Sequence, residues 1–180
     1  MKTLTWMDKS SWGEGAFQQE PDEAQWVDPA TRLNCLIMRN DSGALCGYVG
    51  VTKFHPCFGL DLHSDRIKAI QVHGGVTFAG LVDVRLLQNG QQDGEVSSPQ
   101  CPHQSDEFWW IGFDAAHSSD LCPAWNWTRV MPSWRTYKDF DYVKEEVESL
   151  SQQLHYLLII WIGLIYQNFG QENINEQRTN

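Results

Sequence analysis

The chain has 180 residues, a formal net charge of −10 and 42% hydrophobic residues, including nine tryptophans. This length suits one domain, or one domain with an appendage, and the apolar content is ample for a core. The negative charge argues against general nucleic-acid binding, which needs lysine and arginine to neutralise phosphates. It is compatible with a basic partner surface or with DNA mimicry, and charge alone does not choose between them.

The cysteines indicate a reducing compartment. They are odd in number, and no Cys-x-x-Cys pair occurs. The first 26 residues are polar and do not form a signal peptide. We therefore expect free, mostly buried thiols in a cytosolic protein. Cys101 and His103 are spaced like a pair of metal ligands, but no further ligands at a helpful spacing are visible, so no metal ligand is assigned there. The five cysteines are Cys35, Cys46, Cys57, Cys101 and Cys122.

Residues 1–30 are predicted to be an irregular segment that contains tryptophan. Trp6, Trp12 and Trp26 are separated by polar residues and show no clear period. We expect them to dock this segment onto the core. Residues 21–26 begin with proline and two acids, which favours one helical turn.

A β-hairpin is predicted next. Residues 34–38 and 45–51 have the composition of strands, and Asn-Asp-Ser-Gly at 40–43 is a strong turn signal. Gly47 and Gly50 lie inside the second strand, which indicates a bulge or a close approach of another part of the chain. The following residues, 52–65, are expected to form a loop.

That loop contains His55, Asp61 and His63, which would be either site ligands or ordinary solvated side chains. Residues 67–84 are rich in apolar and β-branched residues and predict a long strand or a pair of strands, broken at Gly74-Gly75. The polar stretch 88–106 predicts a long surface loop.

Residues 108–113 are predicted to form the central strand of the sheet, because they are the most apolar run in the middle of the chain. A long C-terminal helix is predicted from apolar residues at alternating steps of three and four. From 156 to 166 the helix is apolar on all sides but shorter than the about 20 residues that span a membrane, which favours a buried or dimer-forming helix. Residues 167–180 are expected to be a disordered polar tail. The stripe consists of Phe140, Val143, Val147, Leu150, Leu154, Leu157, Trp161 and Leu164.

Together these elements predict an α+β fold, with a mainly antiparallel sheet and the long C-terminal helix packed on one face. The expected organisation is the irregular segment at 1–30, an α+β core domain at 31–154, and an apolar helix extension with a polar tail at 155–180.

Three stretches carry a resemblance to a known group of proteins. They are Cys46-Gly-Tyr-Val-Gly-Val51 with His55-Pro56 after it, Val72-His-Gly-Gly-Val-Thr-Phe78, and Trp109-Trp-Ile-Gly-Phe-Asp-Ala-Ala-His-Ser-Ser-Asp120. Their order resembles that of uncharacterised small proteins of bacteriophages and mobile elements, with His-Gly-Gly and Gly-Phe-Asp-x-Ala-His motifs before a helix. The resemblance covers about residues 33–154 and implies a phage-like origin and a shared site, but not a reaction. The apolar extension after Leu154 departs from the group's pattern.

The expected catalytic residues are His73, Asp114 and His117. Asp114 and His117 are three residues apart, so a tight turn would place them on one side, and an adjacent His73 strand would bring His73 to Asp114. An aspartate that orients a histidine is a workable general acid–base pair near neutral pH. The alternative without a function is structural. In it, Asp114 and His117 only form hydrogen bonds within a turn, Gly74 and Gly75 form a bulge, and His73 is a buried histidine whose hydrogen bonds are all made within the fold.

The expected ligand-binding residues are Gly74 and Gly75, whose backbone N–H groups suit an anion, together with Thr77, Trp109 and Asp120. Trp109 would stack on a base. No residue is assigned as a metal ligand, although two imidazoles with one or two carboxylates also suit zinc or manganese, so a divalent metal is a candidate cofactor.

These expectations lead to two hypotheses, and whether the protein is an enzyme stays open between them. The first is a phage-type counter-defence protein that binds a nucleotide or another phosphate-bearing ligand through a His/Asp pocket and acts on it as a hydrolase. The alternative is a non-enzymatic, anti-CRISPR-like inhibitor that binds a host defence protein through an acidic, tryptophan-rich surface. A third, blander class is a structural phage protein that assembles through the helix. We expect a location in the host cytoplasm, no transmembrane span, and a homo-oligomer formed through the C-terminal helix.

Overall fold

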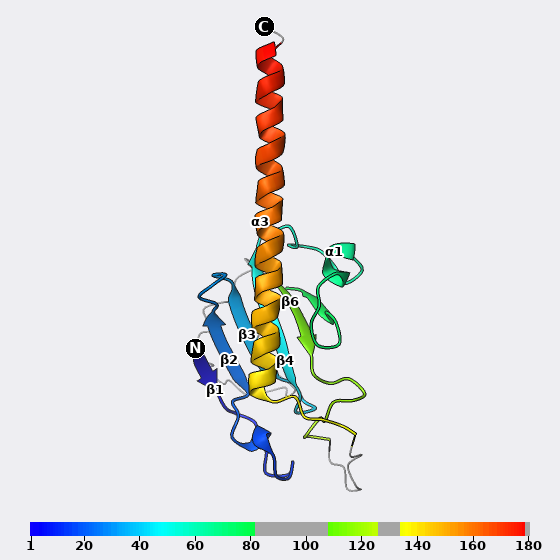
Figure 1. The fold of residues 1–180 in the computed structure, drawn as a ribbon. Helices are drawn as coiled ribbons and strands as arrows, with labels where there is room; N and C mark the ends of the chain where they lie inside the picture. Colours follow the sequence, from blue (N-terminus) through cyan, green and yellow to red (C-terminus); the bar gives the residue numbers. More distant parts are fainter. Residues whose placement is uncertain (82–107, 126–133, 179–180) are drawn as a thin grey trace.

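The fold is an antiparallel sheet crossed on one face by a long helix, which confirms the α+β prediction (Figure 1). A computed structural model describes residues 1–81, 108–125 and 134–178, and the side chains of the last helix as far as residue 167. The strands lie in the order β1-β2-β3-β4-β6-β5, and every neighbouring pair is antiparallel. Their bounds are β1 Lys2–Leu4, β2 Glu23–Val27, β3 Asn34–Arg39, β4 Leu45–Thr52, β5 Phe78–Gly80 and β6 Phe108–Asp114. The helices are η1 Ala16–Gln18 (a 3-10 helix), α1 Asp65–Lys68 and α3 Phe140–Arg178.

The predicted hairpin is confirmed as β3 and β4. Their register runs from the pair Asn34–Gly50 to the pair Arg39–Leu45. The Asn40 side-chain oxygen accepts hydrogen bonds from the backbone of Ser42 and Ala44, and Gly43 adopts φ 81°. A side chain that accepts bonds from its own turn, followed by a glycine with positive φ, is the reason that this short sequence reverses the chain.

Helix α3 packs its apolar stripe against the sheet. Val143, Val147, Leu150 and Leu154 are fully buried in the main core. A Cβ atom on Gly47 would lie 2.5 Å from Val147 Cγ2, so the glycine in β4 allows the helix to approach closely. The predicted stripe is confirmed as far as Leu157, which packs partly buried against this core.

Beyond this point α3 projects away from the sheet into open space (Figure 1). Trp161 and Leu164, which belong to the same stripe, are therefore 40% and 50% exposed. The helix continues to Arg178, so the expected disordered tail is helical up to that residue. Among the described residues, no helix combines the length and the apolar character needed to cross a membrane.

The N-terminal segment differs from the prediction. Residues 1–30 are only partly irregular, because they supply β1 and β2, and Glu23–Val27 form a strand where a helical turn was expected. Pairing with β3 satisfies this backbone, and the period-2 alternation places Ala24 and Trp26 against the core. Backbone pairing with β3 therefore outweighs the local helix preference of residues 21–26, because strand formation depends strongly on tertiary context.

The segment 67–84 was also predicted incorrectly. Within its described part it contains the end of α1, a loop, and only the short strand β5. Gly74 and Gly75 have φ values of 67° and 87°, which a β-strand does not tolerate. The expected loop at 88–106 lies outside the described residues. Residues 108–113 do form a strand, β6, but it lies between β4 and the edge strand β5 rather than at the centre.

A buried ionic network joins the N-terminal segment to the start of α3. The Arg39 guanidinium, with a fully buried side chain, donates to Asp22 and Glu20, with N–O distances of 3.0 Å in both pairs. It also donates to the Tyr137 hydroxyl at 2.7 Å. Glu20 in turn accepts the Phe140 N–H at 3.0 Å and thereby caps the helix. This network ties the start of α3 to β3 and to the segment before β2.

The described cysteines are free and buried, as expected. Burial is the main reason that the pKa of Cys35 rises to about 12 and that of Cys57 to about 11. Both are therefore unreactive thiols in the folded protein. Cys101 lies outside the described residues. The described cysteines are Cys35, Cys46, Cys57 and Cys122.

Candidate functional site

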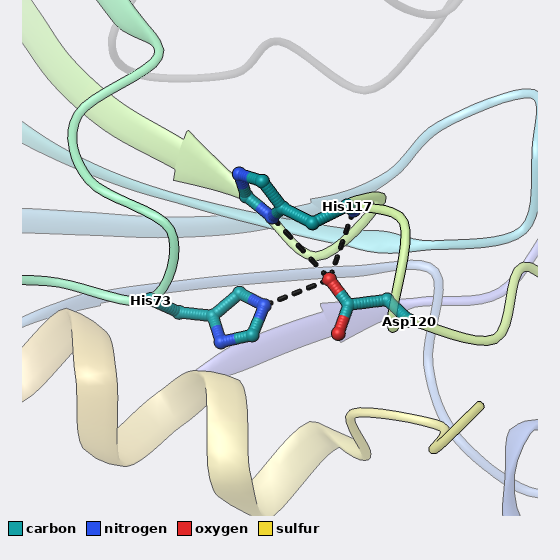
Figure 2. Close-up of side chains that lie close together, drawn as sticks. All are labelled: His73, His117 and Asp120. Atoms are coloured by element: carbon teal, nitrogen blue, oxygen red, sulfur yellow. Dashed lines mark hydrogen bonds and ion pairs between the residues drawn. The ribbon is translucent and has the colours of Figure 1, made fainter. Parts of the chain in front are cut away.

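Two histidines and one aspartate converge beside the end of β6. His73 comes from the loop between α1 and β5, while His117 and Asp120 belong to the turn that follows β6. His73 Nε2 lies 2.8 Å from Asp120 Oδ2, and His117 Nδ1 lies 3.3 Å from the same oxygen. Figure 2 shows both imidazoles turned toward the carboxylate. We call these three residues the His–Asp cluster.

The turn after β6 holds Asp120 in place. Asp120 Oδ2 accepts the His117 backbone N–H at 2.9 Å, and the Asp120 N–H donates to the His117 carbonyl, also at 2.9 Å. On the other side, Asp120 forms a β-bridge to Thr136, in which the Leu121 N–H donates to the Thr136 carbonyl and the Thr136 N–H donates to the Ser119 carbonyl. These contacts position the carboxylate before any ligand arrives.

Helix α3 positions the other arm of the cluster. The His73 N–H donates to Glu146 Oε2 at 2.7 Å, and His73 Nδ1 lies 3.0 Å from the Tyr142 hydroxyl. The rings of His73 and Tyr142 meet edge to face, with centroids 5.5 Å apart. Both ring nitrogens of His73 are thus engaged, one by α3 and one by Asp120.

Gly74 allows the two histidines to approach each other. A Cβ at this position would lie 2.0 Å from His117 Cε1, so only glycine leaves room for the imidazole. Its φ of 67° also favours glycine. The His73 and His117 rings consequently pack edge to face, with centroids 5.2 Å apart.

Asp120 is a buried charge that its neighbours stabilise. Its exposed fraction is 0%. Burial acts to raise the pKa of this carboxyl, but hydrogen bonds from His73 and from the His117 backbone outweigh it, and the pKa lies below its usual value. A carboxylate only accepts hydrogen bonds, so His73 Nε2 carries the hydrogen in this contact.

His117 is the more accessible of the two histidines. Its side chain is 32% exposed, against 13% for His73. Within the described part of the chain, neither His117 Nδ1 nor Asp120 Oδ1 has a hydrogen-bond partner, although both atoms are buried. The arrangement can therefore exchange a proton at His117, or accept a cation between the three side chains.

The prediction that His73 meets Asp114 is wrong. Alternation along β6 places Phe113 in the core under α3, whereas Trp110 belongs to the cluster on the opposite face. Asp114 shares the face of Trp110, and there it adds to the effect of burial that raises the pKa of Cys46. Its Oδ1 accepts the Ala116 N–H at 3.0 Å, so Asp114 supports the turn, as the structural alternative expected. Asp120, expected only to bind ligand, takes the central place instead.

The expected ligand-binding residues are only partly near the cluster. The Gly75 N–H donates to the Val72 carbonyl at 2.9 Å, so it is not available to an anion. Thr77 is exposed, and its N–H donates to the Gly112 carbonyl. The indole N–H of Trp109 donates to the Leu60 carbonyl at 3.0 Å, and the side chain packs against the main core. Trp109 is therefore a core residue at the far end of β6 and does not stack at this site.

The loop 52–65 holds structural histidines and acids. His55 is buried, its Nδ1 accepts the Cys57 N–H at 3.0 Å, and its Nε2 lies 2.9 Å from the Leu154 carbonyl. Burial lowers the pKa of His55, which favours the neutral ring that this arrangement requires. Asp61 accepts the N–H groups of His63 and Ser64 and caps the turn before α1.

Sequence reasoning missed Tyr142 and Glu146. The two residues are one helical turn apart, so they share a side of α3 next to the buried stripe. This spacing shows that they point the same way, but no sequence signal links them to His73. Comparisons with protein-family models, curated protein sequences and solved structures give no match for this chain.

Proposed function

We propose that this chain is a phage-type counter-defence protein that binds a nucleotide or another phosphate-bearing ligand at the His–Asp cluster, in the host cytoplasm. Hydrolysis of that ligand is the reaction that the cluster would catalyse. The observation that carries the proposal is the buried Asp120 carboxylate with an imidazole on either side, one of them partly open to solvent. Such a set is suited to general acid–base chemistry.

The roles of the two histidines follow from their contacts. His73 is held through both ring nitrogens and serves to fix the carboxylate. His117 keeps its Nδ1 beside Asp120 and is the ring that can reach a ligand from solvent. Lys138, whose ammonium lies 4.8 Å from the Tyr142 ring centroid, offers a positive charge to an anionic ligand, while Asp120 and Glu146 add negative charge to the same surroundings.

A ligand screen tests this proposal. Nucleotides and other phosphate-bearing compounds are titrated into the full chain, and binding and hydrolysis are both measured. His117→Ala should abolish hydrolysis and weaken binding, while His63→Ala, at an exposed histidine outside the cluster, should leave both unchanged. Binding that is equal in wild type and His117→Ala would contradict the proposal.

A second candidate function is the non-enzymatic inhibitor. It is favoured by the exposed hydrophobic surface, since large exposed apolar patches mark interaction sites. Trp125 and Trp134 are 46% and 61% exposed, and the α3 extension exposes large hydrophobic side chains from 156 to 166. The two tryptophans would bind a host defence protein, and the α3 extension would bind a second copy of the chain. Pull-down from host lysate with wild type and Trp134→Ala separates this function from the first, because the His–Asp cluster is intact in both.

A further inference from the structure

We infer that His73, His117 and Asp120 bind one divalent transition-metal ion. Of the described residues, these three bring one ligand atom each to within 4.8 Å of one another. Two ligand atoms at about 2.1 Å from a tetrahedral ion lie about 3.4 Å apart. The observed distances from Asp120 Oδ2 to the imidazole nitrogens are 2.8 Å and 3.3 Å. These two distances are close to those around a bound ion, and the ligand atoms of all three residues lie within 4.8 Å of one another.

Unpartnered atoms in the cluster supply the second observation. Asp120 is fully buried, yet its Oδ1 has no hydrogen-bond partner within the described residues, and the same holds for His117 Nδ1. A buried carboxylate oxygen and a buried ring nitrogen that remain unpaired are costly. A cation held by Asp120 Oδ2 and His117 Nδ1 would give this nitrogen a partner, and a bidentate carboxylate would engage Oδ1 as well.

The surroundings resemble the outer shell that orients metal ligands. The Tyr142 hydroxyl, 3.0 Å from His73 Nδ1, fixes that ring and can accept the hydrogen of Nδ1, so that Nε2, directed at Asp120, gives up its proton when a metal binds. The His117 backbone N–H, 2.9 Å from Asp120 Oδ2, fixes the carboxylate. Hydrogen bonds of this kind hold ligands in register and are typical of metal sites.

The donor set selects the class of metal. Two imidazoles with one carboxylate suit zinc and other first-row transition ions, whereas Mg²⁺ and Ca²⁺ prefer oxygen ligands. Three protein ligands leave a fourth position open, as in catalytic rather than structural zinc sites. The partly exposed side of His117 is where solvent or a ligand oxygen would reach that position.

This inference is independent of the proposed ligand, because metal binding is measured with the metal alone. The full chain is treated with a chelator, and Zn²⁺ binding is followed by calorimetry, with Co²⁺ absorption as a second readout of imidazole and carboxylate ligation. We expect saturation at one ion per chain. His117→Ala, His73→Ala and Asp120→Asn should each weaken binding by about tenfold or more.

His63→Ala is the matched control, since His63 is exposed and outside the cluster, and it should bind like wild type. His117→Ala is the decisive variant, because its partly exposed side chain can be removed with little risk to folding, which circular dichroism checks. Absence of saturable binding of Zn²⁺ and Co²⁺ to the folded wild-type chain would overturn the inference. So would binding that survives all three cluster substitutions, or that His63→Ala removes.

Discussion

His73 Nε2 and Asp120 Oδ2 lie 2.8 Å apart although the two residues are 47 positions apart in the chain. His73 is anchored to α3 through Tyr142 and Glu146, and Asp120 is anchored to the turn after β6. Their contact therefore links the helix to the sheet edge. The His–Asp cluster exists only when α3 has docked, so its integrity reports on tertiary structure and not only on local turns.

Gly74→Ala should disrupt the cluster, whereas Gly75→Ala should not. Both glycines have positive φ, so an alanine at either position costs about 1 kcal/mol or more in backbone strain. Only at Gly74 does the added Cβ collide with the His117 ring, since Gly75 faces open space. We expect Gly74→Ala to weaken metal or ligand binding well beyond Gly75→Ala, as measured by calorimetry. Equal effects of the two variants would show that the close packing of His117 is irrelevant.

Asp120→Asn should show a stability difference that depends on pH. The pKa of Asp120 in the folded protein is below its usual value of 3.8. The stabilisation by its charge is thus fully present above about pH 4 and is lost as the pH falls through the folded-state pKa. At neutral pH, Asp120→Asn should reduce the free energy of unfolding by about 1.5–3 kcal/mol, the usual worth of a hydrogen bond to a charged group.

Urea denaturation of wild type and Asp120→Asn from pH 7 to pH 3 measures this difference. The other acids with lowered pKa values, Asp22 and Asp28, are present in both proteins and cancel in the comparison. The gap between the two proteins should narrow below pH 4. A gap that stays constant over the whole range would contradict the assignment of a stabilising charge to Asp120.

Arg39→Ala should be strongly destabilising, by about 3 kcal/mol, because it removes a buried cation shared by Asp22 and Glu20 and leaves Lys9 as the only ion-pair partner of Asp22 among the described residues. Asp22 is fully buried and Glu20 nearly so, and Glu20 would lose the support it needs to cap α3. The control is Lys144→Ala, which removes the exposed pair with Glu148 at 2.7 Å. That pair should be worth about 0.3–0.5 kcal/mol. Urea denaturation at neutral pH compares the two, and similar losses would contradict the central role of Arg39.

The α3 extension should drive self-association. A helix that is apolar on all sides is normally covered, and Ile160 and Leu164 are 42% and 50% exposed in the single chain. We expect the wild-type chain to form oligomers in light scattering, and the double variant Ile160→Glu/Leu164→Glu to be monomeric. Gln152→Glu, on the exposed side of the same helix within the domain, is the control and should remain oligomeric. A monomeric wild type would contradict the prediction.

Local sequence signals were reliable where a segment's own chemistry decides its structure. The Asn40–Gly43 turn, the β3–β4 hairpin and the heptad-like stripe of α3 are all visible in the sequence, because side-chain periodicity and turn residues act over short distances. The His-Gly-Gly motif likewise identified His73 and a glycine that tolerates positive φ. Local signals failed at β2, where pairing with β3 decides the structure of the segment.

For the stretch from Trp109 to His117, the sequence by itself determined a strand followed by a polar turn. It also identified His73, His117 and Asp120 as candidate site residues. Tertiary structure alone decided which acid serves the histidines. The alternation of β6 turns Asp114 to the face opposite α3, while the following turn carries Asp120 back beneath both rings. Which aspartate meets the histidines depends on which face of the sheet α3 covers. Local sequence does not determine this, because helix and sheet are distant in sequence.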